Sequence, residues 1–133
     1  MAYEQSGSGI IITLTAAADL SAKQYNFVKL DANGDVVLTD ADSAGQVPIG
    51  VLQNAPGNGE AASVMIVGVS KVEAGVAFNE GVQIACSDGS SAADDGQAVV
   101  ADASDCVVGQ SITAGAADEY ITAAINCASP TIF

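Results

Sequence analysis

Short hydrophobic runs rich in Val and Ile alternate along the chain with clusters of Gly, Asn, Asp and Ser. β-Branched residues suit the half-buried surface of a sheet, whereas Gly and Asn favour turns. No stretch carries a convincing helical stripe. A helical turn is expected only at Ala16–Lys23, where Asp19 or Ser21 could cap it. The pattern predicts strands at Ile10–Leu14, Tyr25–Leu30, Val36–Leu38, Val47–Leu52, Ser63–Val69, Val82–Ala85, Gln97–Ala101, Cys106–Ile112 and Tyr120–Asn126.

The spacing of these runs predicts an all-β fold. Strands of about five to seven residues that recur about every ten to fifteen residues indicate a compact antiparallel β-sandwich or barrel. Residues 1–9 (MAYEQSGSG) are polar and rich in Gly and Ser, so we expect an extended N-terminal arm there. Residues 10–133 then form a single β domain, which is long enough for one modest core.

The composition of the apolar residues indicates that this core is poor in large side chains. The chain has 25 Ala, 15 Val and 10 Ile but only five Leu, six aromatic residues and no Trp. Alanine contributes little hydrophobic free energy when it is buried. We therefore expect association with other chains to supply part of the stability.

The charge balance excludes several classes of partner and site. Three Lys against sixteen acidic residues give a formal net charge of −13, so the chain cannot neutralise nucleic-acid phosphates or an anionic membrane surface. We also expect no signal peptide and no membrane-spanning segment. The sequence has no His, which removes the usual general base and the commonest metal ligand. No cofactor and no metal are predicted.

Four residue pairs could carry catalysis, but a structural interpretation is favoured for each. Serine–lysine chemistry needs a lysine of lowered pKa, which sixteen carboxylates oppose. Paired carboxylates could hydrolyse glycosides, but there are no Arg and few aromatic residues to grip a sugar. A small hydrolase stays open as a minor alternative, which a cleft of converging carboxylates with perturbed pKa values would support. The pairs are Ser70–Lys71, Ser21–Lys23, Asp94–Asp95 and Asp118–Glu119.

The segment Asp31–Asp35 (DANGD) has two interpretations. The oxygens of Asp31, Asn33 and Asp35 have the spacing of the first ligands of a calcium loop. The match then fails, because the sixth position is Val36 and strand-like runs flank the segment. Asn33-Gly34 between two such runs favours a hairpin instead, since both residues tolerate positive φ.

Three cysteines, Cys86, Cys106 and Cys127, lie in or beside apolar runs. Without a C-x-x-C spacing or a His, a zinc site is not expected. Buried free thiols in a reducing compartment are favoured. A disulfide between Cys127 and either of the other two is the alternative.

One ordered set of residues resembles a known family. It comprises Asp19–Ala22 (DLSA), Tyr25-x-Phe-Val28, Ile49–Pro56 (IGVLQNAP) with Gly59, Val64-x-Ile-x-Gly68, Gly81 and Val108-Gly109. Their order and spacing resemble the decoration, or cement, proteins of tailed-bacteriophage capsids, over roughly residues 10–126. Ile49–Pro56 is the most specific part.

The resemblance implies a non-enzymatic, mainly β protein on the outer surface of the virion head. Such a protein is made in the host cytoplasm, binds the major capsid protein and associates with itself, commonly as a trimer. The arm then lies on the capsid protein or on a neighbouring copy, and the carboxylates form the solvent-facing side, although a saline habitat could also explain the acidity. Another structural subunit of a phage or surface lattice (tail tube, fibre base or surface layer) is the alternative. The expected assembly contacts are Tyr3, Ile10, Ile49, Val51, Leu52, Pro56 and Phe133.

Overall fold

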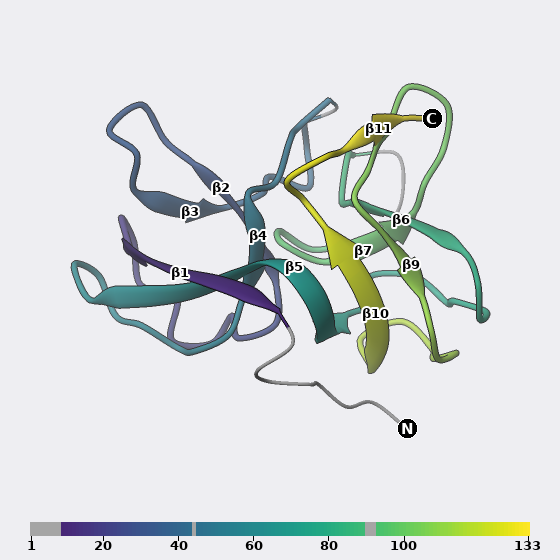
Figure 1. Ribbon diagram of the computed structural model, residues 1–133, viewed down its shortest axis with the longest axis horizontal. Helices are drawn as coiled ribbons and strands as arrows, with labels where there is room; N and C mark the ends of the chain where they lie inside the picture. The colour runs from purple at the N-terminus through teal and green to yellow at the C-terminus, as the bar shows by residue number, and fades with distance from the viewer. Residues whose placement is uncertain (1–8, 44, 90–92) are drawn as a thin grey trace.

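The computed structural model describes residues 9–43, 45–89 and 93–133, and these residues form an all-β fold (Figure 1). Within that part of the chain no helix is long and apolar enough to cross a membrane. The strands are β1 (Ile10–Thr15), β2 (Phe27–Leu30), β3 (Val36–Leu38), β4 (Gly50–Leu52), β5 (Ala61–Glu73), β6 (Gln83–Cys86), β7 (Ala98–Val100), β8 (Cys106–Val107), β9 (Gly109–Ser111), β10 (Tyr120–Asn126) and β11 (Thr131–Ile132).

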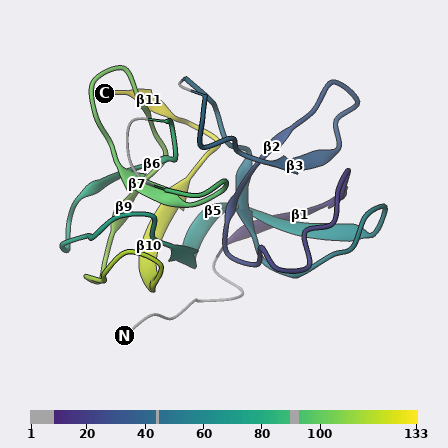
Figure 2. The ribbon, with the colours of Figure 1, turned by 180° about the vertical axis from the view of Figure 1, so that it is seen from behind.

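Nine of these strands form one antiparallel sheet, built around the long strand β5. The order is β3-β2-β4-β5-β10-β9-β6-β7, and β1 also pairs with β5. The first half of β5 pairs with β1 and the second half with β10, so β5 runs through the middle of the molecule in Figures 1 and 2. Strands β8 and β11 form a separate two-stranded sheet.

The large sheet curls into a half-barrel, and parallel bridges link its ends to other parts of the chain. Ala16, just after β1, bridges Val36 at the start of β3, and Ala74, just after β5, bridges Ala98 at the start of β7. The predicted sandwich or barrel is therefore realised as one curled sheet, because β5 is long enough to serve both halves.

Two main hydrophobic cores lie on opposite faces of β2 and β4. Successive residues of a strand point to opposite faces. Phe27 and Val51 accordingly enter one core, which we call the large core, and Val28 and Leu52 enter the other, the small core. The small core also holds Ala16, Leu20, Val36, Ala62 and Val64. The large core also holds Val72, Ala74, Phe78, Ile84, Cys86, Ala98, Cys106, Val108, Ile121, Ala123, Ile125 and Cys127.

Two predicted strands, Val36–Leu38 and Tyr120–Asn126, are confirmed at their predicted bounds. The predicted strand Val47–Leu52 is shortened to β4, and the prediction over Cys106–Ile112 divides at Val108 into β8 and β9. Strand β5 extends the prediction Ser63–Val69 at both ends. Strand β11 was not predicted, because a strand of two residues directly after Pro130 is too short to show a pattern.

The helical turn expected at Ala16–Lys23 is wrong. The carboxylate of Asp19 accepts a hydrogen bond from the Ser21 N–H at 3.1 Å, and the Lys23 N–H donates to the Leu20 carbonyl at 3.0 Å. These bonds form tight turns without a helix. Leu20 is buried in the small core, which explains why a polar-looking segment stays against the sheet.

The hairpin interpretation of Asp31–Asp35 is confirmed, since β2 and β3 pair antiparallel on either side of it. The Gly34 N–H donates to the Asp31 carbonyl at 3.1 Å, and the Asp31 N–H donates to the Asp35 carbonyl at 2.9 Å. Within the segment Asp31–Asp35, Gly34 is the residue that adopts a positive φ, of 80°. The loop is thus a turn followed by a left-handed glycine, a common three-residue hairpin connection.

Candidate assembly surface

The carboxylate of Asp31, weighed above as a cation ligand, forms hydrogen bonds within its own loop. It accepts hydrogen bonds from the N–H groups of Asn33 at 2.9 Å and Asp35 at 3.0 Å. Among the described residues, no group of three or more Cys, Asp or Glu side chains is arranged to hold a metal ion.

The candidate serine–lysine pair of β5 has other partners. The buried Ser70 hydroxyl donates to the Lys71 carbonyl at 2.8 Å and accepts from the Gln53 amide at 2.9 Å. The Lys71 ammonium lies 5.4 Å from the ring centre of Tyr25, which forms an edge-to-face pair with Tyr120. These contacts keep the lysine on an aromatic face, where a cation is stabilised.

The candidate carboxylate pairs hold loops together. Asp95 accepts from the Ala41 N–H at 2.9 Å, and Asp118 accepts from the Gln97 amide at 3.0 Å. Glu119 accepts from the Ala116 N–H at 2.6 Å. The carboxylates of Asp95, Asp118 and Glu119 therefore each have a backbone or amide partner that accounts for their position.

The three cysteines are free and buried, as predicted, and all belong to the large core. Burial raises the pKa of the Cys86 thiol to about 12 and that of Cys127 to about 12, and it also raises the pKa of Cys106. A thiol of such high pKa stays protonated near neutral pH and is a poor nucleophile or metal ligand.

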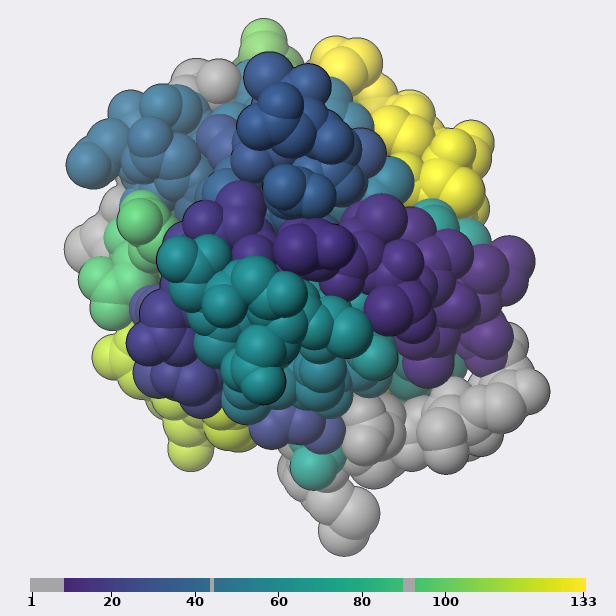
Figure 3. Space-filling model, turned by 90° about the vertical axis from the view of Figure 1, so that its left-hand side faces the viewer, coloured from purple at the N-terminus to yellow at the C-terminus, as the bar shows by residue number. Residues whose placement is uncertain are grey.

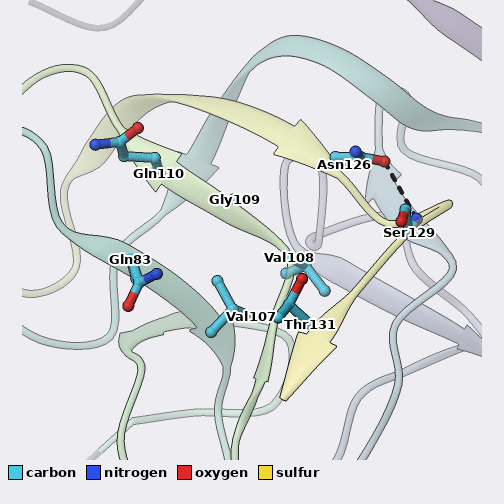
Figure 4. Close-up of a pocket in the computed structure, with 8 residues that line it drawn as sticks. All are labelled: Gln83, Val107, Val108, Gly109, Gln110, Asn126, Ser129 and Thr131. Atoms are coloured by element: carbon cyan, nitrogen blue, oxygen red, sulfur yellow. Dashed lines mark hydrogen bonds between the residues drawn. The ribbon is translucent and has the colours of Figure 1, made fainter. Parts of the chain in front are cut away.

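The structure has a polar groove of about 310 Å³ between β6, β9 and the C-terminal segment (Figure 4). Amide and hydroxyl side chains line it, and none of its residues is ionisable. Asn126 at the end of β10 accepts a hydrogen bond from the Ser129 N–H at 3.2 Å and thereby fixes one wall. The lining residues are Gln83, Val107, Val108, Gly109, Gln110, Asn126, Ser129 and Thr131.

A second hollow, of about 320 Å³, lies between the loops around Asp42 and Asp94. Lys23 lines it together with Asp42, Asp94 and Asp95. This second hollow gathers three carboxylates beside a lysine, which is the arrangement that the minor hydrolase alternative requires, although the Asp95 carboxylate accepts a hydrogen bond from the Ala41 N–H.

Three of the contact residues expected from the sequence are buried inside the chain. Val51 and Leu52 are fully enclosed, one in each main core, and Pro56 is buried where its carbonyl accepts from the Leu20 N–H at 2.9 Å. These residues have no free surface to offer a partner. The resemblance of Ile49–Pro56 to the decoration family therefore rests on a core element.

The same element shows why Gly50 is required. A Cβ at this position would collide with the carbonyl of Met65 and with the side chain of Val64 on β5. The glycine therefore permits the close approach of β4 to β5.

Two expected contact residues are exposed at opposite ends of the described chain. Ile10 opens β1, and Phe133 follows β11. Ile49 is half-buried against the small core, and Tyr3 lies outside the described residues. As contacts with another chain, Ile10, Ile49 and Phe133 stay predictions.

The sequence interpretation missed two exposed neighbours, Ile11 and Ile132. Figure 3 shows that β1, drawn in purple, forms an open band on one side of the molecule. The sequence does set these two residues apart, because they belong to the stretches 5–18 and 120–133, which contain no charged side chain.

Comparison with known proteins identifies the fold. No protein-family model and no curated protein matches the chain. Among solved structures, the N base of the head fibre gp8.5 of bacteriophage phi29 matches with a TM-score of 0.63 and 19% identity, over 89% of this chain and 96% of that one. A chain of the capsid of Myoviridae phage XM1 matches with a TM-score of 0.59 and 16% identity, over 95% of this chain and 88% of that one. The chain shares its fold with these two proteins.

Proposed function

We propose that the protein is a structural component of a tailed-phage head that decorates the outer surface of the shell and stabilises it. The observation that carries this proposal is the shared fold: two phage head proteins match almost the whole chain. The sequence resemblance to capsid decoration proteins supports the same role independently of the structure.

The distribution of side chains supports a role in binding other proteins. Several large apolar side chains are exposed on edge strands, among them Ile10 and Ile11 on β1 and Ile132 on β11. Apolar contact surfaces combined with a charged, water-facing remainder are typical of subunits of an assembly. In this proposal the major capsid protein is the partner, and copies of the chain associate as trimers.

The residues 1–9 belong to the proposal as the arm that lies on the capsid protein or on an adjacent copy. Of these, residues 1–8 lie outside the described part of the chain. Deleting residues 2–8 should lower the number of copies bound per capsid. Unchanged occupancy after the deletion would contradict this part of the proposal.

A second candidate is the base of a head fibre, since one of the matching structures is such a base. Both candidates place the chain on the head, but they differ in what it carries. A fibre base holds a further elongated structure, whereas a decoration protein ends at the shell.

The test is to add purified protein to undecorated capsids and to image the particles by electron microscopy. Decoration predicts density at regular positions over the whole shell, with saturable binding. Density only at isolated points that extends outward as a rod would favour the fibre base. Density on a tail, or no density on the head, would contradict both candidates.

A further inference from the structure

The second half of β5 has one edge with which, among the described residues, no strand pairs. Val67 pairs with Ile10 of β1 and with Asn126 of β10, so these two strands lie on opposite edges of β5 (Figures 1 and 2). Strand β10 continues along its edge as far as Glu73, whereas the pairing of β1 ends at Val67. We call the stretch of β5 left on the β1 side, Gly68–Val72, the open edge.

Hydrogen bonds at the end of β5 show which backbone groups face the open edge. The Ala74 N–H donates to the carbonyl that precedes β10 at 2.9 Å, and the Glu73 N–H donates to the Tyr25 carbonyl, on the opposite side, at 3.0 Å. Because N–H groups alternate between the two edges of a strand, those of Val69 and Lys71 point to the same side as that of Glu73. A strand edge of this kind is a template for pairing with a further strand.

The described part of the chain begins directly beside the open edge. A Cβ on Gly68 would lie 2.9 Å from the Gly9 Cα, and one on Gly9 would lie 2.7 Å from the Val67 carbonyl oxygen. Residues 1–8 precede this close contact and lie outside the described residues. Five residues of extended chain span about 17 Å, so residues 4–8 are long enough to follow the open edge to its end.

The register of β1 fits these residues to the open edge. Continued toward the N-terminus, it places residues 6–8 (Ser-Gly-Ser) opposite Val69–Lys71, with the glycine opposite Ser70. The buried Ser70 hydroxyl accepts from the Gln53 amide at 2.9 Å, and a glycine brings no side chain into that contact. The same hydroxyl donates to the Lys71 carbonyl at 2.8 Å, which leaves this carbonyl one further lone pair. The small residues therefore fit the edge without displacing an existing contact.

Two tyrosines position a lysine at the far end of the open edge. The Lys71 ammonium lies 5.4 Å from the ring centre of Tyr25, whose ring meets that of Tyr120 edge to face at 5.7 Å. Backbone hydrogen bonds fix Tyr25, because its N–H donates to the Leu52 carbonyl at 2.7 Å and its carbonyl accepts from the Glu73 N–H. Tyr120 is 48% exposed. We call Tyr25, Lys71 and Tyr120 the lysine site.

Charge favours residues 1–8 as the segment that covers the open edge. Their one charged side chain is the carboxylate of Glu4. Lys71 is the one cation of β5 and β10, and the neighbouring Glu73 carboxylate already accepts from the Asn26 amide at 3.0 Å. Glu4 and the lysine site are therefore complementary in charge and lie within reach of one another along the edge.

We propose that in the free protein residues 4–8 lie along the open edge as a continuation of β1, with the Glu4 carboxylate at the lysine site. Glycine has a low strand propensity, and an exposed ion pair contributes little, so this docking is weak. The arm can therefore leave the edge when a capsid offers a stronger contact. The inference goes beyond the proposed function, because it describes the free protein.

The test measures amide hydrogen exchange by NMR for the full chain and for a chain that lacks residues 2–8. The amides of Val69 and Lys71 should exchange several-fold faster in the shortened chain. Those of Ser70 and Val72 face β10 and are the matched internal controls, which should exchange equally in both chains. Unchanged exchange of Val69 and Lys71, or acceleration of all four amides by the same factor, would overturn the inference.

Substitution of Glu4 tests the lysine site in a chain of full length. Glu4→Gln should speed exchange at Val69 and Lys71 about two- to threefold, and less at high salt, because salt screens an exposed ion pair. Glu80→Gln, which removes the same charge from the exposed turn before β6, is the matched control and should have no effect. In Lys71→Gln chains, Glu4→Gln should also have no effect. An equal effect with and without the lysine would contradict the contact.

Concentration dependence distinguishes this occupant from a second copy. Protection of the open edge by the chain's own arm should not change with protein concentration, and protection that rises with concentration would overturn the inference. Binding to capsids is measured separately. Capsid binding by a protein whose open edge is unprotected when free would leave the proposed function standing and remove this docking. A protected edge in a protein that does not bind capsids would do the reverse.

Discussion

The two main cores of the molecule are built differently although they share two strands. The small core consists of aliphatic side chains around Leu20 and Leu52. The large core contains two aromatic residues, Phe27 and Phe78, and all three cysteines. Phe27 and Val28 of β2 and all three residues of β4 are buried because they lie between the two cores, and so the cores are expected to unfold together.

The contrast explains how a chain poor in large side chains builds one continuous curled sheet. The large core concentrates the bulky residues, and β5 extends the same sheet over the small core. Exposed apolar residues remain on strands β1, β2, β7, β10 and β11 and in segments between strands. The following predictions test this division, from the largest expected effect to the smallest.

The largest effect is expected where a charge enters the small core. Leu52→Asp places an ionised group in a fully buried position without a partner. The free energy of unfolding should fall by about 4–5 kcal/mol, measured by urea denaturation. Leu30→Asp, on an exposed position of β2, should change it by no more than about 0.5 kcal/mol. A stable, assembly-competent Leu52→Asp protein would contradict the placement of this side chain.

The next prediction compares neighbouring residues of β2 that face different cores. Phe27→Ala should lower the free energy of unfolding by about 3–5 kcal/mol, because it leaves a cavity in the large core. Val28→Ala removes two methyl groups from the small core and should lower it by about 2 kcal/mol. Both variants should unfold in a single transition by fluorescence and by circular dichroism. Two separate transitions would show that the cores are independent.

The buried thiols of the large core should make the free energy of unfolding depend on alkaline pH, whereas the small core contains no such group. The pKa values of Cys86 and Cys127 are raised by burial to about 12, whereas thiols in the unfolded chain ionise near pH 8.5. Above that pH the unfolded state binds fewer protons than the native state, so stability falls as pH rises. The expected loss is about 1.4 kcal/mol per pH unit for each thiol.

The measurement compares urea denaturation at pH 8 and pH 10 for the wild type and for the Cys86→Ala/Cys127→Ala protein. The doubly substituted protein should be less stable at pH 8 and lose less stability on going to pH 10. Equal losses in the two proteins would show that these thiols are not the groups that titrate.

The smallest effect is expected in the β2–β3 hairpin. Gly34 has a φ of 80°, which alanine adopts only with strain, and a Cβ there would meet no neighbouring atom within 4 Å. Gly34→Ala should therefore lower the free energy of unfolding by about 1 kcal/mol through backbone strain alone. An unchanged urea midpoint would argue against a left-handed residue at this turn.

Much of the fold follows from local pattern. Alternating β-branched residues and Gly-containing turns predicted an all-β domain, and DANGD predicted its hairpin, because these features depend on neighbours in the sequence. The length of β5 could not be predicted in this way. Its second half is defined by pairing with β10, some fifty residues later in the chain.

The contact surface was harder to predict than the fold. Val51, Leu52 and Pro56 are apolar, and a single sequence does not distinguish apolar residues of a core from those of an interface. Ile10 and Phe133 were chosen for their positions at the ends of the domain, and the structure leaves both exposed. The exposure of Ile11 and Ile132 became apparent only from the structure, in which β1 pairs with β5 and β11 with β8.

The central claim is that the protein stabilises a phage head by apolar contacts among many copies. The direct test is to heat capsids with and without the protein over a series of salt concentrations and to count bound copies. Charge repulsion among chains is screened beyond about 10 Å at 0.1 M salt, so occupancy should rise from very low to moderate salt. The temperature at which the capsids rupture should rise as the number of bound copies rises. Two results would contradict the account. One is that fully occupied capsids and capsids without the protein rupture at the same temperature. The other is that the number of bound copies falls steadily as salt rises.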